Sequence, residues 1–161
     1  MPAPDTDRAV QQSLLDRLID REPGDQVEAP LSRPESLRRL RASVRRDIEW
    51  LLNTIRVVEA PAGLTELAKS LYMYGIPDLS SMSLESAQDG QRLLRSLERA
   101  VSQFEPRLTN VRVTSVDKIS KKRMYIEFHI DALLLIDPLP ERLSFDTVFE
   151  VARGAYKVKE Q

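Results

Sequence analysis

Residue types that support catalysis, cofactor binding or export are absent or scarce in this chain of 161 residues. It has no cysteine, which excludes disulfides, thiolate zinc sites and cysteine nucleophiles and suits a reducing compartment. Its 5 glycines are isolated, so neither a phosphate-binding loop nor a dinucleotide fingerprint can be assembled. A single histidine cannot supply the ligand set of a zinc site. We therefore expect no cofactor and no metal.

Charge of one sign and long apolar runs are missing as well. The 24 Lys and Arg residues nearly balance the 25 Asp and Glu residues, so no chain-wide basic field can hold a phosphate backbone. The longest apolar run, residues 132–136, is far shorter than the roughly 18 residues of a membrane span, and the start lacks the apolar segment of a signal peptide. We expect a cytoplasmic protein with no nucleic-acid partner and no direct membrane insertion.

What is present is the composition of one globular domain, with 42% hydrophobic and 30% charged residues. We interpret residues 1–31 as an N-terminal arm, 32–157 as a single domain and 158–161 as a tail that frays. The arm carries a short amphipathic helix. With little chain nearby to cover it, its apolar stripe is expected to bind a partner. The stripe consists of Leu14, Leu15, Leu18 and Ile19.

A long helix is predicted to begin after Ser32, because Pro34 lies in its first turn and Glu35 completes a capping box. About 24 residues follow with one apolar stripe. The stripe consists of Leu37, Leu40, Val44, Ile48, Leu51, Leu52, Ile55 and Val58. The other face carries an arginine cluster that includes Arg45 and Arg46. Such a face is either solvated or binds a partner, and here a protein partner is favoured.

A connector and a further helix precede the sheet. Gly75 before Ile76 and Pro77 predicts a fixed bend with a positive φ at the glycine. Leu67, Leu71, Ile76 and Leu79 are expected to pack beneath it. The next helix, capped by Ser81 or Ser83, should end at Pro106. Its expected core face is Leu84, Ala87, Leu94, Leu97, Val101 and Phe104.

After Pro106 the hydrophobic period changes from 3.6 to 2. Alternating patterns occur at residues 111–114, 124–130 and 143–151, with short polar or proline-rich connections between them. Neighbouring strands joined in this way form an antiparallel β-meander most simply. Helices first and strands afterwards predict an α+β domain, with the N-terminal helices packed on a three-stranded antiparallel C-terminal sheet.

The most informative local pattern is Glu105, Pro106 and Arg107. Pro106 forces the chain out of the helix, so Glu105 and Arg107 can project to the same side where the helix joins the sheet. An ion pair there would hold the register of the junction. The alternative is a simple helix stop with two exposed charges.

Catalytic interpretations are weaker. His129 is expected on the polar strand face with Tyr125, Glu127 and Asp131, without a nearby nucleophile motif. Glu105 with Glu127 or Asp131 could be drawn as a glycosidase pair. However, 25 acidic residues produce such pairs by chance, and the aromatics that form sugar clefts make up only 6% of the chain. We expect no catalytic residue.

Four segments in order carry a family resemblance: residues 13–18, 46–54, 74–78 and 105–108. Together they resemble the TssE subunit of bacterial type VI secretion systems. That family is similar to the baseplate wedge protein of contractile-tailed phages and has carried the label "lysozyme-like". One departure is Ile55 before Arg56, where the family pattern has paired arginines.

The resemblance implies a non-enzymatic part of a cytoplasmic baseplate near the inner membrane. Its implied partners are other wedge subunits, sheath subunits and the central spike or hub. Glu105, Pro106 and Arg107 match the family's assembly motif. The implied mechanism is strand addition, in which arms of sheath subunits pair with an exposed sheet edge. The alternative that the old label suggests is a peptidoglycan hydrolase.

Overall fold

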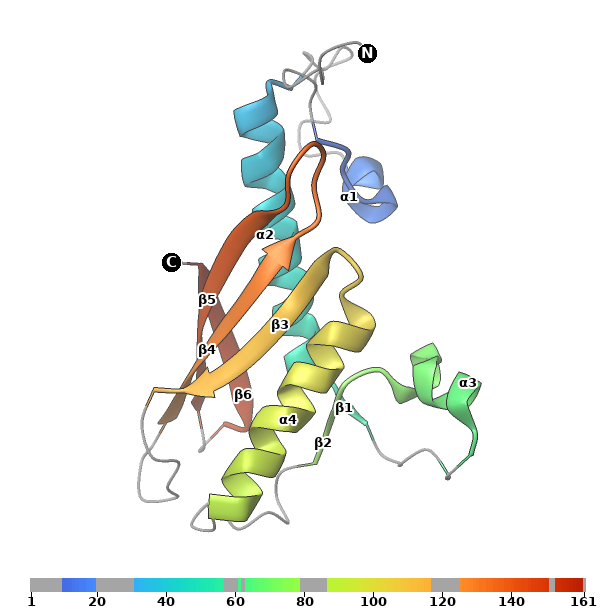
Figure 1. Ribbon diagram of the computed structural model, residues 1–161, viewed down its shortest axis with the longest axis vertical. Coiled ribbons are helices and arrows are strands. Elements are labelled where there is room, and N and C mark those ends of the chain that lie inside the picture. The colour runs from blue at the N-terminus through green and yellow to red at the C-terminus, as the bar shows by residue number, and fades with distance from the viewer. Residues whose placement is uncertain are drawn as a thin grey trace.

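The computed structural model describes residues 10–19, 31–56, 61, 63–78, 87–116, 125–150 and 153–160. Its elements in chain order are α1 (Leu14–Leu18), α2 (Arg33–Leu52), β1 (Ile55–Arg56), α3 (Thr65–Lys69), η1 (Leu71–Met73), β2 (Ile76–Pro77), α4 (Ala87–Phe104), β3 (Leu108–Ser115), β4 (Tyr125–Leu134), β5 (Glu141–Glu150) and β6 (Ala155–Glu160). Helices α2 and α4 lie against one face of a four-stranded antiparallel sheet, as Figure 1 shows. The predicted α+β class is confirmed.

Helix α2 begins as predicted and ends earlier than predicted. The Ser32 hydroxyl accepts a hydrogen bond from the Glu35 N–H, and Pro34 lies in the first turn. The helix stops at Leu52, because Asn53 turns its side-chain amide back to the Glu49 carbonyl at 2.8 Å. Ile55 therefore leaves the predicted stripe and is exposed in β1. Val58 lies outside the described residues.

The bend at Gly75 has the predicted positive φ, +109°. It brings β2 alongside β1 in a short parallel pair, and the Ile76 N–H donates to the Thr54 carbonyl at 2.9 Å. Ile76 is buried as expected, and Met73 is buried with it. The prediction for Leu71 was wrong: it is exposed, because the chain turns through the 3-10 helix η1 there. Leu79 lies outside the described residues.

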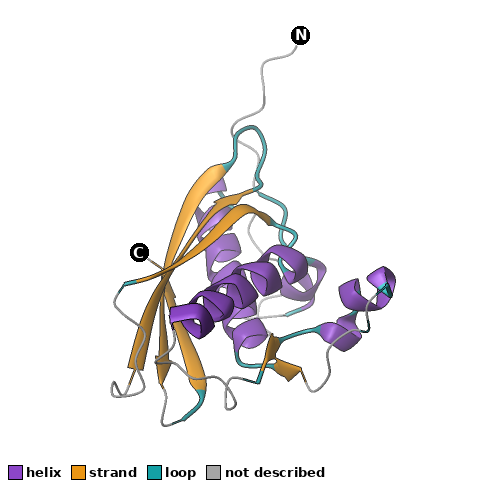
Figure 2. Ribbon diagram, turned by 60° about the horizontal axis from the view of Figure 1, so that its bottom comes forward, coloured by secondary structure: helices purple, strands orange, loops and turns teal. Residues whose placement is uncertain are grey.

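Helix α4 packs along β3 and α2, and Figure 2 shows both long helices on the same side of the sheet. Its most buried side chains are Leu93, Leu97, Ala100 and Val101. Leu93 rather than the predicted Leu94 points fully into the core, and Leu94 is only partly buried. The predicted caps Ser81 and Ser83 and the predicted core residue Leu84 lie outside the described residues.

The sheet has four strands, not the predicted three. The additional strand β6 pairs with β5 in antiparallel register, Phe149 opposite Tyr156 and Thr147 opposite Val158. Residues 158–160 were expected in a fraying tail, and this expectation was wrong. Tyr156 and Val158 are buried under α2, with the Tyr156 and Phe149 rings 4.5 Å apart. Burial of alternate side chains makes the lysine-rich segment a strand.

The two faces of the sheet differ as the alternation predicts. Phe128, Ile130 and Phe145 point toward the helices and form the centre of the core. His129 lies on the opposite, polar face, where its Nδ1 is 2.5 Å from a carboxylate oxygen of Asp146. That face is made of ordinary solvent-facing polar side chains.

One buried polar atom in the core predicts a stabilising substitution. Thr147 is fully buried, and its hydroxyl has no hydrogen-bond partner among the described residues. Because an unpaired buried hydroxyl costs about 1–3 kcal/mol, Thr147→Val should raise the free energy of unfolding by about 1 kcal/mol. Urea denaturation measures the change, with the exposed Thr114→Val as the control, expected within about 0.5 kcal/mol of the parent. A less stable Thr147→Val protein would mean that the hydroxyl is satisfied.

Candidate assembly site

The junction between α4 and β3 is held by Glu105 and Arg107. Pro106 ends the helix, and the next turn closes when the Leu108 N–H donates to the Glu105 carbonyl at 3.1 Å. Arg107 Nε donates to Glu105 Oε1 at 2.6 Å, and Nη2 donates to Glu105 Oε2. Glu105 is only 3% exposed. The ion pair is thus bidentate and largely buried, and it is not a pair of exposed charges.

Helix α2 supplies the other half of this site. Arg107 Nη2 also donates to Asp47 Oδ2 at 2.6 Å, and Nη1 donates to the Ser43 hydroxyl at 3.0 Å. Burial alone would lower the pKa of Arg107, but the hydrogen bonds and charges of Glu105 and Asp47 raise that pKa above its ordinary value. The guanidinium therefore stays charged and ties the start of β3 to α2.

Helix α1 joins the same set of contacts. Asp16 accepts from Arg46 Nη1 at 2.8 Å and from the Ser43 hydroxyl, and Arg46 Nε donates to Asp47 Oδ1 at 2.9 Å. Three carboxylates and two guanidinium groups thus meet around one serine. We call this set the charged network; it consists of Asp16, Ser43, Arg46, Asp47, Glu105 and Arg107.

Sequence reasoning found Arg46, Glu105 and Arg107 of the charged network and missed Asp16, Ser43 and Asp47. Ser43 and Asp47 had a detectable signal, because they stand four residues apart next to the buried stripe of α2. Ser43 is 2% exposed beside the apolar Val44, where a polar residue needs a partner. A serine and an aspartate on an otherwise apolar stripe indicate a polar contact across the core, although not with which residue.

The N-terminal segment is bound through its polar side. The Val10 N–H donates to the Ser36 hydroxyl, and the Gln12 side chain donates to the Ser36 carbonyl, both at 2.8 Å. None of the α1 residues is buried, and Leu14 and Leu18 are 75% and 82% exposed. Leu15 and Ile19 are also exposed. The polar side of α1 therefore faces the domain, and its leucines face solvent.

A groove of about 640 Å³ runs between α1 and the junction. Leu15, Trp50 and Pro106 contribute to its walls, together with the Tyr74 and Phe104 rings, which contact each other edge to face at 5.3 Å. Arg46 lies 4.9 Å from the centre of the exposed Trp50 ring. Leu15 of α1 and the Glu105, Pro106 and Arg107 motif thus line the same groove.

Arg45 lies apart from this site. Its Nη1 donates to the Val158 carbonyl at 3.2 Å and lies 3.8 Å from Glu49 Oε2. Arg46 joins the charged network, whereas Arg45 covers the edge of β6. The two neighbouring arginines, expected together on one partner-binding face, therefore have different contacts.

Acidification is expected to release α1 before the domain unfolds. Burial raises the pKa of Asp16, but hydrogen bonds from Ser13, Ser43 and Arg46 outweigh burial and hold that pKa below its usual value. The stabilisation is therefore complete above about pH 4 and is lost as the pH falls through the lower folded pKa. Trp50, the single tryptophan, should report this as a fluorescence transition in acid. Asp16→Asn should lack the transition; an unchanged transition in this variant would assign it to another group.

A buried ion network thus joins three chain segments, and an apolar helix face is left to solvent. A scan against protein-family models matches the family described as "Baseplate wedge protein gp25" over residues 38–139. The match covers more than half of the chain, and this protein belongs to the baseplate wedge protein gp25 family. It is therefore a structural baseplate component of a contractile system, and the predicted family resemblance is confirmed.

Searches of curated proteins and of solved structures found no significant match. Among the described residues, no helix is long and apolar enough to cross a membrane.

Proposed function

We propose that this protein is the TssE-like wedge subunit of a type VI secretion baseplate, positioned in the cytoplasm at the inner membrane, and that it starts sheath assembly by strand addition. The observation that carries the proposal is the position of Arg107. Its side chain is fixed in the charged network, and its backbone carbonyl accepts from the Leu135 N–H at 2.8 Å, directly before β3 begins. The assembly motif thus sets the position of an edge strand.

The contacts of the two sheet edges favour β3 as the templating edge. On β6, the Tyr156 N–H and carbonyl pair with the Asn53 side chain at 2.8 and 2.9 Å. The Val158 N–H donates to Glu49 at 3.1 Å, and the Val158 carbonyl accepts from Arg45. An incoming strand at β6 would have to displace Arg45 and Glu49 of α2 and Asn53, which follows the helix.

Among the residues that the structure describes, fewer side chains contact the outer edge of β3. The Val116 N–H pairs with the Glu127 carbonyl, so antiparallel alternation places the Val113 N–H on the outer side. Among the described residues, the side chain that binds it is Glu98 of α4, at 3.1 Å. The Glu98 carboxylate on β3 is easier to displace than the Asn53 amide, the Glu49 carboxylate and the Arg45 guanidinium together on β6. We therefore place strand addition at β3.

Site-specific photocrosslinking tests this assignment. A benzoyl-phenylalanine at the exposed Thr114 of β3 should crosslink to sheath subunits during assembly, whereas the same group at the exposed Lys157 of β6 should not. Crosslinks at residue 157 alone would show that β6, and not β3, is the templating edge. No crosslink to sheath at either position would contradict strand addition.

The exposed side of α1 is proposed as the contact for other wedge subunits, with the spike or hub as a further partner. Leu14→Gln with Leu18→Gln should leave the melting temperature unchanged, because both side chains are exposed. Losing two leucines from an interface should weaken capture of co-produced wedge subunits at least about tenfold. The matched control is Leu139→Gln, at a 74% exposed leucine of the β4–β5 turn. Equal capture by both proteins would exclude this face of α1.

The double leucine substitution is easier to interpret than a deletion of the N-terminal arm. Removing residues 1–32 would also take Asp16 away from Ser43 and Arg46 and leave those polar groups without their partner. A loss of binding after deletion would therefore mix interface effects with folding effects, whereas the leucine substitutions separate them.

A hydrolase role is not supported by the site. Glu105 and Asp47 lie close together, but both accept hydrogen bonds from the same guanidinium. We expect no turnover in a dye-release assay on peptidoglycan. Turnover that disappears in Glu105→Gln would contradict the assembly role.

A further inference from the structure

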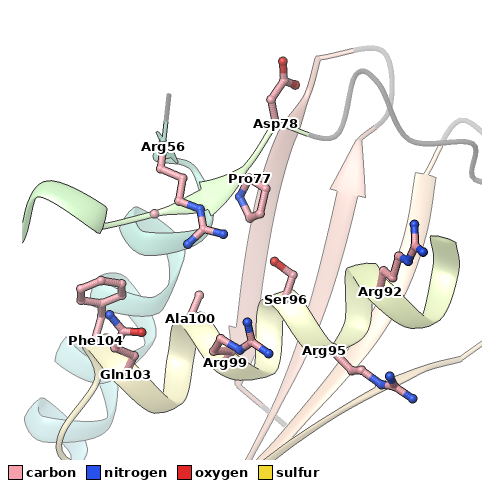
Figure 3. Close-up of a pocket in the computed structure, with 11 residues that line it drawn as sticks. Arg56, Pro77, Asp78, Arg92, Arg95, Ser96, Arg99, Ala100, Gln103 and Phe104 are labelled. Atoms are coloured by element: carbon pink, nitrogen blue, oxygen red, sulfur yellow. The ribbon is translucent and has the colours of Figure 1, made fainter. Parts of the chain in front are cut away.

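A second concave surface lies on the other side of α4, away from the charged network. It is a cleft of about 500 Å³ between α4 and the β1–β2 pair, shown in Figure 3. Four arginines line it: Arg56 from β1 and Arg92, Arg95 and Arg99 from α4. In Figure 3 the Arg56 guanidinium points toward α4, and the Asp78 carboxylate points away from it. We call this surface the arginine cleft.

The positive charge of the arginine cleft is poorly balanced within the described residues. Arg92 has Asp89 at 3.5 Å, an exposed helix pair of small effect. No described carboxylate forms an ion pair with Arg56, Arg95 or Arg99. An anionic group in the cleft would therefore be favoured by charge.

The spacing of the arginines fits an extended peptide. Arg92 and Arg99 are seven positions apart on one helix, which corresponds to about 10 Å along its axis. An extended chain covers about 3.3 Å per residue, so carboxylates three residues apart match this distance. Pro77, Ala100 and Phe104 add apolar surface to the lining of the cleft, which can contact aliphatic side chains.

We propose that the arginine cleft binds an acidic, extended segment of another protein of the baseplate, with Arg92 and Arg99 holding carboxylates along α4 and Arg56 facing them from β1. A peptide is favoured over nucleic acid because the whole chain has a net charge of −1 and the positive charge is local. The proposal is independent of strand addition, because it involves β1, β2 and α4 and no edge of the four-stranded sheet.

Selection from a phage-displayed random dodecapeptide library tests the proposal. The immobilised full-length protein should enrich peptides with Asp or Glu spaced two to four residues apart. The best peptide, labelled with fluorescein, should bind Arg56→Gln/Arg99→Gln at least about tenfold more weakly than the parent by fluorescence anisotropy, a factor typical of losing one charged contact.

The matched control is Arg142→Gln/Arg153→Gln, which changes the net charge equally at two arginines whose side chains are 77% and 78% exposed. It should bind the peptide like the parent, and far-ultraviolet circular dichroism should show that both double variants are folded. Three results would overturn the proposal: enrichment of peptides that are not acidic, equal weakening in both double variants, or stronger competition by single-stranded DNA of equal charge than by unlabelled peptide.

Discussion

Arg107→Ala is expected to lower the melting temperature of the purified protein by about 6–12 °C. The substitution leaves the carboxylates of Glu105 and Asp47 without the guanidinium that both contact. Breaking a buried pair from one side costs about 3–5 kcal/mol. Arg107 and Asp47 keep 22% and 24% of their side-chain surface exposed, which places the effect at the lower end, about 3 kcal/mol. For a protein of this length, each 1 kcal/mol shifts the melting temperature by about 2–4 °C.

Two further variants distinguish the stability lost by breaking the charged network from the stability lost by removing any positive charge. Arg142→Ala removes an arginine that is paired with Asp131 but 77% exposed, and it should cost less than about 1 kcal/mol. Glu105→Gln combined with Arg107→Ala removes the carboxylate that loses its guanidinium, whereas Asp47 keeps Arg46, so the double variant should be more stable than Arg107→Ala alone. If Arg107→Ala costs no more than Arg142→Ala while sheath assembly fails, Arg107 contacts a partner directly and does not act through the fold.

Gly75→Ala should be the other strongly destabilising change, by about 2–4 kcal/mol. The residue has a φ of +109°, and an added Cβ would lie 2.3 Å from the Thr54 carbonyl oxygen. Strain at such a φ costs about 1–3 kcal/mol, and the backbone shift breaks the Ile76 hydrogen bond to the same oxygen, worth about 1 kcal/mol. Chemical denaturation measures the loss.

Gly63→Ala is the matched control for Gly75→Ala. Its φ is also positive, at +91°, but nothing lies within 4 Å of an added Cβ. It should therefore show the conformational cost alone, about 1 kcal/mol. Equal losses in the two variants would show that close approach to Thr54 is unimportant and that only the backbone conformation matters.

The features that sequence reasoning predicted well are those with local causes. The cap at Ser32, the positive φ of Gly75 and the helix stop at Pro106 each depend on a few neighbouring residues, and the structure has all three. The ion pair between Glu105 and Arg107 also follows from local geometry, because the two residues flank Pro106.

The features that it missed depend on contacts between distant residues. β6 has only Tyr156 and Val158 as large apolar residues, beside Ala155 and two lysines, and its outer edge is satisfied by Asn53 and Glu49, about a hundred positions earlier in the chain. Ile55 continues the helical spacing of α2 and still leaves the helix, because Asn53 caps it and β2 pairs with residue 55.

The same limit applies to the candidate site. A charged pair was predictable at the junction, whereas its connection to Asp47 and Asp16 was not, because neither α2 nor α1 shows in sequence where it packs. The arginine cleft was missed for the same reason: Arg56 meets the α4 arginines only through the turn at Gly75.

We propose that this baseplate wedge protein starts sheath assembly, and sheath extension in cells tests that role. Cells that carry the secretion system, a fluorescent sheath subunit and a deletion of this gene should form no extended sheath. The wild-type chain should restore extension, and Arg107→Ala should not. Normal sheath extension in the deletion strain, or full restoration by Arg107→Ala, would contradict the account.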